Sequence, residues 1–190
     1  MLKVLQPTKF FSKEAKKDLK IGDTFEVCPL AVEFSKDIAS LIELTKGAAL
    51  IVDYGEDHAF SNSFRGIQNH TLVKDWETIF DEVGRMDLTA YVNFKQIAEV
   101  AKMNKKVVSF EPMPQGQFLE SMGIRVRMQA LQQKLADKNK RDLLETSYVR
   151  LCSPDEMGAI YKFLYLGHKE NREIFPFLGE QTEKEHSMYG

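Results

Sequence analysis

A run of five apolar residues, 48–52, lies between Gly47 and the polar tip Asp53-Tyr54-Gly55. The run contains no alternating polar residues, which predicts a strand covered on both faces, as in a parallel sheet packed between helices. Open α/β sheets bind their ligands at the carboxyl ends of their strands. The pattern therefore predicts an α/β fold with this tip on the ligand side of the sheet.

The segment before this run predicts a strand followed by a helix. Residues 24–28 are rich in β-branched and aromatic types, Pro29 suits the first position of a helix, and Gly47 suits its C-cap. A strand–helix–strand unit of about 30 residues has the size of a right-handed βαβ crossover. We therefore expect the 24–28 strand, which carries Glu26, to lie parallel to the 48–52 strand at roughly 4.8 Å.

The rest of the chain continues this mixed pattern. Asn93 followed by Gln96 predicts an N-cap for a helix whose inner face is apolar. Further strands are expected at 87–92, 107–110 and 161–166, and further helices at 72–83, 94–101, 115–122, 124–135 and 143–151, with a last helical turn that starts at Pro154.

Composition narrows the function classes. The 190 residues carry a formal net charge of -2, so no global basic field points to nucleic acid. No apolar run approaches the roughly 20 residues that span a bilayer. Cys28 and Cys152 lie far apart in the sequence and form no metal-binding pattern, which favours two buried, inert thiols in a reducing compartment. The four histidines show no metal spacing, and we expect no metal site.

Two acidic strand tips, Glu26 and Asp53, are the candidate catalytic groups. Glycine-rich phosphate loops, a nucleophile elbow and a zinc-binding helix are absent from the sequence. Two carboxylates at neighbouring strand ends can hold a guanidinium through charge-assisted hydrogen bonds. They can equally orient a ribose, cap a helix or lie in solvent, and the residues alone leave these interpretations open.

Arg65 and His70 lie in the polar stretch after the central strand. Either they line a loop that folds over a ligand, or they are an exposed loop arginine and a surface histidine. Tyr54, Gly55, Arg65 and His70 are therefore the candidate substrate-binding residues, and the sequence assigns no cofactor-binding residue.

Several short motifs occur together in a fixed order. They are Phe25-Glu26-Val27-Cys28-Pro29, Gly47 to Gly55, Phe64-Arg65-Gly66, His70, Asp87-Leu88-Thr89-Ala90, Gly116-Gln117-Phe118-Leu119, Met122-Gly123-Ile124-Arg125-Val126-Arg127 and Met157-Gly158. This ordered set resembles the MidA-like family of S-adenosylmethionine-dependent methyltransferases.

The resemblance implies a function. Mitochondrial members of this family are complex I assembly factors that methylate an arginine in a core subunit of that complex. By this resemblance we expect a protein arginine N-methyltransferase in the mitochondrial matrix that uses S-adenosyl-L-methionine, acts on a protein substrate and can form a homodimer. Glu26 and Asp53 would then hold the substrate guanidinium.

The resemblance also implies an architecture with a gap. Residues 1–179 would form the C-terminal part of a class I, Rossmann-like methyltransferase sheet with added helices, and 180–190 a flexible tail. The first strands and the glycine-rich loop of that sheet are missing from this sequence, so the alternative is a non-catalytic fragment or isoform that acts as a protein-binding module. The Glu26 strand would be the fourth strand, the Asp53 strand the fifth, and the last strand antiparallel. Asn93 stands where relatives tend to have Asp, which preserves helix capping but not an acidic role.

Overall fold

The computed structural model describes residues 25–58, 60–81, 84–171 and 174–177. The predicted tail at 180–190 and the N-terminal segment before Phe25 lie outside these ranges. Trp76 begins a helix, but its side chain is not among the described ones.

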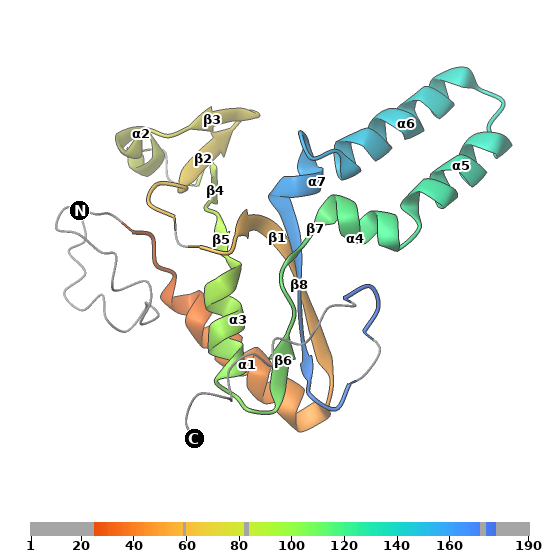
Figure 1. Ribbon diagram of the computed structural model, residues 1–190. Coiled ribbons are helices and arrows are strands. Elements are labelled where there is room, and N and C mark those ends of the chain that lie inside the picture. The colour runs from red at the N-terminus through yellow and green to blue at the C-terminus, as the bar shows by residue number, and fades with distance from the viewer. Residues whose placement is uncertain (1–24, 59, 82–83, 172–173, 178–190) are drawn as a thin grey trace.

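A mixed sheet forms the centre of the molecule (Figure 1). Its strands run in the order β5-β1-β8-β6, and β7 pairs with β8. The pairing of β1 with β8 is antiparallel over its whole length, whereas β5 pairs with β1 in parallel at the carboxyl end of β1. The strands are β1 (Ala48–Glu56), β5 (Val92–Asn93), β6 (Val107–Ser109), β7 (Met113–Pro114) and β8 (Tyr161–His168).

Two helices cover one face of this sheet. They are α1 (Pro29–Thr45) and α3 (Phe94–Lys102). Their inner residues form one core cluster with Leu164 and Leu166 of β8. The predicted N-cap of α3 is confirmed, because Asn93 Oδ1 accepts a hydrogen bond from the Gln96 amide at 3.1 Å. The predicted inner face of α3 is buried as expected: Phe94, Ile97, Ala98 and Ala101.

On the opposite face of the sheet, the described residues form a core cluster beside β8. Phe163 and Tyr165 of β8 form a second cluster with Phe177, and Phe118 stacks on Phe163 with ring centroids 3.9 Å apart. Phe118 belongs to α4 (Gln115–Ser121), which leads into the helices α5 (Ile124–Lys134), α6 (Lys138–Cys152) and α7 (Met157–Ile160).

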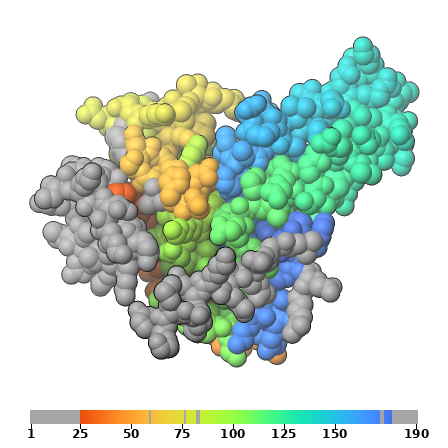
Figure 2. All heavy atoms as spheres, viewed as in Figure 1, coloured from red at the N-terminus to blue at the C-terminus, as the bar shows by residue number. Residues whose placement is uncertain are grey.

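Helices α5 and α6 form a hairpin that projects from the body of the molecule (Figures 1 and 2). Its base is tied to α4, since Glu120 Oε1 lies 2.9 Å from Arg125 Nη2 and also accepts a hydrogen bond from the Tyr148 hydroxyl. Arg125 and Tyr148 both hold the pKa of Glu120 below its usual value. No residue of α6 is buried, so the hairpin contributes little to the core.

A small second sheet lies at the carboxyl end of β1. Its strand order is β3-β2-β4, and the short helix α2 lies between β3 and β4 in the sequence. The bounds are β2 (Arg65–Gln68), β3 (Thr71–Val73), β4 (Asp87–Thr89) and α2 (Trp76–Asp81). Asp75 caps α2 by accepting a hydrogen bond from the Thr78 amide at 2.9 Å.

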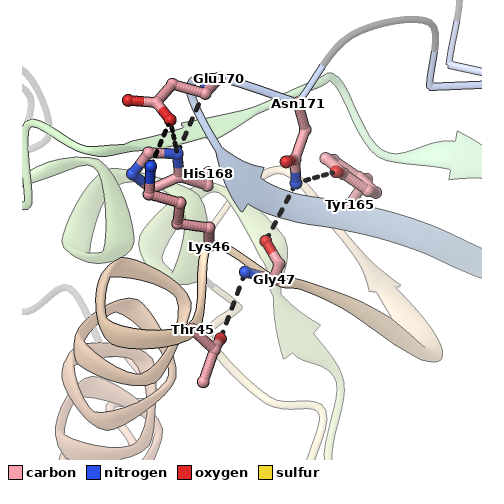
Figure 3. A network of polar contacts seen from close by, with 7 residues as sticks. All are labelled: Thr45, Lys46, Gly47, Tyr165, His168, Glu170 and Asn171. Carbon is pink, nitrogen blue, oxygen red and sulfur yellow. Dashed lines mark hydrogen bonds and ion pairs between the residues drawn. The ribbon is translucent and has the colours of Figure 1, made fainter.

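The amino end of β1 is closed by polar contacts (Figure 3). The carbonyl of Gly47 accepts hydrogen bonds from the His168 amide and from Asn171 Nδ2, each at 3.1 Å. Lys46 forms an ion pair with Glu170 at 2.8 Å. We call these four residues and Gly47 the amino-end latch.

Several predictions about single elements are wrong. Residues 25–28 form no strand, and Glu26 makes one backbone hydrogen bond, from its amide to the Phe60 carbonyl, in place of a ladder. The predicted parallel pair of Glu26 and Asp53 strands and its βαβ unit are therefore not formed among the described residues. A strand needs a hydrogen-bonded neighbour along its length. The strands that pair with β1 are β8 and β5, and residues 25–28 do not pair with it.

Within the described part of the chain, the central strand is also not covered on both faces. Its apolar residues alternate between partly buried and exposed, and Leu50 and Val52 are 47% and 46% exposed. The lack of alternation in the sequence therefore does not report full coverage within the described residues. The strand is longer than its apolar run and reaches Glu56.

The boundaries of four other predicted elements differ in the structure. The left-handed C-cap of α1 is Lys46, with φ 55°, rather than Gly47. The helix expected at 72–83 is divided between β3 and α2, and the strand expected at 87–92 between β4 and β5. The last helical turn begins at Met157 rather than Pro154.

Candidate functional site

A cavity of about 650 Å³ opens beside the carboxyl end of β1. This volume lies within the range of about 300–1,000 Å³ for small-molecule sites. Its wall is mostly apolar and includes five aromatic side chains, with a few polar groups. The lining residues that matter for the chemistry are Phe25, Glu26, Cys28, Phe60, Tyr91 and Asn93.

Glu26 lines this cavity and holds the loop beside it. Its carboxylate accepts hydrogen bonds from the Phe64 amide at 2.8 Å, from the Ser63 amide and from the Ser63 hydroxyl. Ser63 Oγ in turn accepts a hydrogen bond from the Tyr91 amide at 2.9 Å. A carboxylate has about four acceptor positions. Among the residues that the structure describes, Glu26 uses three of them to fix the loop, two on Oε1 and one on Oε2.

An aromatic group with one arginine stands behind the cavity wall. The guanidinium carbon of Arg65 lies 4.7 Å from the ring centroid of Tyr91 and 5.5 Å from that of Tyr54. The ring of Tyr54 meets those of Tyr91 and Tyr161 edge to face, each at 5.5 Å. The Tyr91 ring also meets Phe60 at 4.9 Å. Tyr54 and Arg65 therefore shape the cavity through Tyr91, without lining it themselves.

Burial raises the pKa of the Tyr54 hydroxyl above its ordinary value. The neighbouring charge of Asp53 raises it further, whereas Arg65 lowers it. The Tyr54 hydroxyl is therefore neutral at physiological pH, and the Tyr54 ring contacts the Arg65 guanidinium. A second cation close to Arg65 is disfavoured by the like charge.

Gly55 brings β1 and β5 together. A Cβ atom placed there would overlap the backbone of Val92, its partner in the parallel register. Because β5 leads into Asn93 and α3, this close approach positions one wall of the cavity. A side chain at position 55 has no room, so Gly55 is a structural requirement of the site.

Asp53 and His70 stand apart from the cavity. Asp53 Oδ1 accepts a hydrogen bond from the Tyr54 amide at 2.8 Å, and Asp53 is not among the lining residues. His70 lies in the turn between β2 and β3, where it and Asn69 adopt left-handed backbone angles with φ 61° and 49°. Its side chain is exposed. Thus the structure gathers Glu26, Tyr54, Gly55 and Arg65 around one site, and places Asp53 and His70 beside it or away from it.

Two further features were not expected from the sequence. Cys28 is exposed rather than buried, and it lines the cavity. Tyr91 links the cavity to Arg65, and only its position next to the Asp87-Leu88-Thr89-Ala90 motif singled it out. Among the described residues, no cluster of potential metal ligands occurs and no helix is long and apolar enough to cross a bilayer.

Comparison with known proteins shows the family of the chain. Residues 3–113 match the model of the family described as "Putative S-adenosyl-L-methionine-dependent methyltransferase". The chain belongs to this family. The match includes every residue that lines the cavity.

The similar curated proteins carry a more specific name. The chain is 37% identical to the human protein arginine methyltransferase NDUFAF7, mitochondrial, over 144 residues, which cover 76% of this chain and 31% of that protein. The Bos taurus protein of the same name is 38% identical over the same coverage. The chain thus spans about a third of the length of these relatives.

Solved structures confirm the fold. A candidate methyl transferase from Burkholderia thailandensis, bound to S-adenosyl-homocysteine, has a TM-score of 0.58 and 21% identity, with 72% of this chain and 35% of that chain covered. A second Burkholderia thailandensis structure reaches a TM-score of 0.63 at 21% identity, with 83% and 44% covered. The predicted α/β class with a Rossmann-like methyltransferase sheet is therefore confirmed, including the antiparallel last strand β8.

Proposed function

We propose that the chain supplies the substrate side of an S-adenosyl-L-methionine-dependent protein arginine methyltransferase. The observation that carries the proposal is that the family match spans the whole cavity around Glu26. The names of the human and Bos taurus relatives support arginine as the methyl acceptor and mitochondria as the compartment.

The cavity suits this chemistry. Aromatic walls can stack on the planar guanidinium, and the carboxylate of Glu26 can receive one of its N–H groups. S-adenosyl-L-methionine supplies the methyl group from its sulfonium. In that reaction the guanidinium nitrogen would form a bond to the methyl carbon as the bond to sulfur breaks, S-adenosyl-homocysteine would leave, and the nitrogen would release one proton to water. Glu26 orients the acceptor in this scheme, while Arg65, Tyr54 and Tyr91 hold the wall in place.

The remaining predicted residues keep weaker roles in the proposal. Asp53 acts on the site through Tyr54, whose hydroxyl it influences electrostatically. We propose a complex I core subunit as the substrate and the mitochondrial matrix as the compartment, following the family resemblance and the names of the relatives.

The test is methyl transfer from S-adenosyl-L-methionine to purified complex I core subunits, with the modified residue located by mass spectrometry. We expect methylated arginine, and loss of the signal with Glu26→Gln but not with Glu33→Gln, an exposed site on α1. Transfer to lysine, or equal transfer by both variants, would contradict the assigned roles.

A second candidate function is a non-catalytic protein-binding module. The exposed apolar side chains of Leu50 and Val52 on β1 favour it, because an exposed apolar surface can bind a partner protein. Calorimetry with S-adenosyl-L-methionine separates the two: tight binding by the 190-residue chain alone excludes the second candidate.

A further inference from the structure

The hairpin of α5 and α6 projects from the molecule and is exposed along most of its length (Figures 1 and 2). Within the described structure, Met128 is the only buried residue of α5, and α6 has none. The hairpin contacts the rest of the molecule mainly through α4 and α7. It therefore adds an exposed surface to the molecule and little to its core.

The base of the hairpin, in contrast, is closely packed. A Cβ atom at Gly116 of α4 or at Gly158 of α7 would overlap the Cys152 carbonyl oxygen at the end of α6. Gln115 Nε2 donates a hydrogen bond to the Leu151 carbonyl at 2.9 Å. These contacts fix the end of α6 against α4 and α7, so the hairpin is held in a defined direction.

The hairpin is basic, although the chain as a whole is not. Residues 124–152 contain seven lysine or arginine side chains and three acidic ones, a formal net charge of +4, whereas the whole chain carries -2. Three of the lysines, Lys134, Lys138 and Lys140, lie at the tip where α5 turns into α6. The charge of the hairpin is thus opposite in sign to that of the rest of the chain.

Most of these cations have no charged partner in the described structure. Arg125 pairs with Glu120, and Arg141 Nη1 donates a hydrogen bond to the Leu135 carbonyl at 2.6 Å. The other five are exposed and form no ion pair with any residue that the structure describes. We call these five residues the basic arm: Arg127, Lys134, Lys138, Lys140 and Arg150.

Exposed apolar residues lie on the same helix faces as the basic arm. Val126 and Lys134 are eight residues apart on α5, and residues at this spacing share a face of a helix. Leu143 and Arg150 share a face of α6, because they are seven residues apart. Val126 is 69% exposed and Leu143 is 66% exposed. Such a surface offers both apolar burial and charge complementarity to an acidic partner.

The hairpin leaves the sheet at the end where the cavity opens. Helix α6 leads through α7 into Tyr161, which lies opposite Tyr54 in the strand register at the carboxyl end of β1. The ring of Tyr54 meets that of Tyr161 at 5.5 Å, and it also meets the ring of Tyr91 in the cavity wall. A protein bound to the hairpin can therefore extend over this end of the sheet.

A protein fits this surface better than a nucleic acid or a membrane. Proteins that bind single strands stack the bases on aromatic side chains. Tyr148 is the one aromatic residue of 124–152, and it is half-buried with its hydroxyl donated to Glu120. Membrane-surface helices have a broad apolar face with aromatic residues, whereas the exposed apolar residues of this hairpin are few and separated by polar ones.

We propose that the basic arm, together with Val126 and Leu143, docks an acidic surface of the protein that is methylated, outside the cavity that receives its arginine. The identity of the partner rests on the proposed function. The charge and exposure of the hairpin are independent of it. Charges on an exposed surface of this kind mainly speed association, and salt screens them.

The experiment measures binding of the 190-residue chain to each purified complex I core subunit by biolayer interferometry, without S-adenosyl-L-methionine. A tip variant removes three charges from the hairpin: Lys134→Gln, Lys138→Gln and Lys140→Gln. A matched control removes three charges from exposed positions outside the hairpin: Lys36→Gln, Lys105→Gln and Lys169→Gln. Circular dichroism checks that both variants are folded.

We expect at least one subunit to bind the chain, and the tip variant to bind it at least about tenfold more weakly, which corresponds to about 1.4 kcal/mol. The control should remain within about twofold of the wild type. Raising the salt from about 0.05 M to about 0.5 M should weaken the wild type more than the tip variant, because the wild type has more charge to screen. Leu143→Ser should weaken binding about threefold at both salt concentrations, because apolar burial is not screened.

Three binding results would overturn the docking proposal. They are no binding to any core subunit, equal losses in the tip variant and the control, and binding through the tip lysines to single-stranded RNA or to phosphatidylcholine vesicles that contain cardiolipin in place of a subunit. Methyl transfer is measured separately on the same samples. Binding through the tip lysines without transfer leaves docking intact and counts against the proposed function. Transfer at the wild-type rate by the tip variant, at subunit concentrations below saturation, supports the function and overturns docking.

Discussion

The two ends of the β1–β8 pair are built from different chemistry. At the amino end, the latch of Lys46, Gly47, His168, Glu170 and Asn171 satisfies its own polar groups (Figure 3). The ion pair of Lys46 with Glu170 lies in solvent, and it lowers the pKa of Glu170. This end fixes where two strands start and stop.

At the carboxyl end, aromatic rings and one arginine surround a cavity whose polar groups are few. Glu26 is the exception, because its carboxylate both fixes a loop and lines the cavity. The polar groups at the amino end thus bind one another, whereas the carboxyl end has a cavity that can accept a ligand. Substitutions at the amino end should therefore affect stability alone, and those at the carboxyl end should affect stability and ligand binding together.

The largest effect is expected at the carboxyl end, for Gly55→Ala. The added Cβ overlaps the backbone of Val92, which cannot move as a flexible side chain would. We expect a loss of about 3 kcal/mol in unfolding free energy and separation of β5 from β1. Urea denaturation measures the loss. Gly123→Ala is the control, since its φ is 81° but no atom lies within 4 Å of the added carbon. That variant should lose about 1 kcal/mol.

Glu26→Gln should have the next largest effect. The amide keeps one acceptor oxygen but puts an NH₂ group toward donors that the carboxylate now accepts from. We expect about 2 kcal/mol lower stability, because hydrogen bonds to charged groups are worth about 1.5–3 kcal/mol. Thermal denaturation, together with binding of S-adenosyl-L-methionine and substrate, measures both consequences. Unchanged ligand binding at full loss of stability would make Glu26 a loop anchor only.

The sequence predicted the sheet better than the site. The apolar run 48–52, the helix start at Pro29 and the Asn93 cap are local signals, and each element formed where these residues indicate. Glu26 was assigned to a strand because of its β-branched and aromatic neighbours, yet pairing depends on what lies beside a segment, which composition does not contain.

The positions of the predicted site residues could be read from the sequence only in part, for a similar reason. Arg65 of β2 lies over the ring of Tyr54 in β1, and the next residue, Gly55, packs against Val92 of β5. His70 belongs to the same motif set, but a two-residue turn directs it away from the cavity. Tyr91 carries no motif of its own, and its contact with Arg65 exists only in three dimensions.

At the amino end, Asn171→Ala should cost about 1 kcal/mol, the net worth of a typical hydrogen bond. Asn171 Nδ2 donates to the Gly47 carbonyl at 3.1 Å and to the Tyr165 hydroxyl at 3.4 Å, and the second, longer bond adds little. The Gly47 carbonyl loses the Asn171 Nδ2 donor but keeps the His168 amide, so it remains satisfied. Chemical denaturation measures the change. Ligand binding and methyl transfer by the folded fraction should remain as in the wild type. A loss of ligand binding in Asn171→Ala would contradict the view that the amino end affects stability alone.

The smallest effect is a change in titration at the carboxyl end. Asp53→Asn removes a charge that raises the pKa of Tyr54, so this pKa should fall, although burial still holds it above the ordinary value. Above the ordinary tyrosine pKa of about 10, the unfolded chain loses the phenolic proton before the folded chain does. Stability therefore falls as pH rises there, and it should fall less steeply in Asp53→Asn. The difference in tyrosinate absorbance between each protein and its Tyr54→Phe counterpart measures the pKa. Asp57→Asn, an exposed change in the same loop, should leave it unmoved; an equal shift in both variants would show that Asp53 has no special influence on Tyr54.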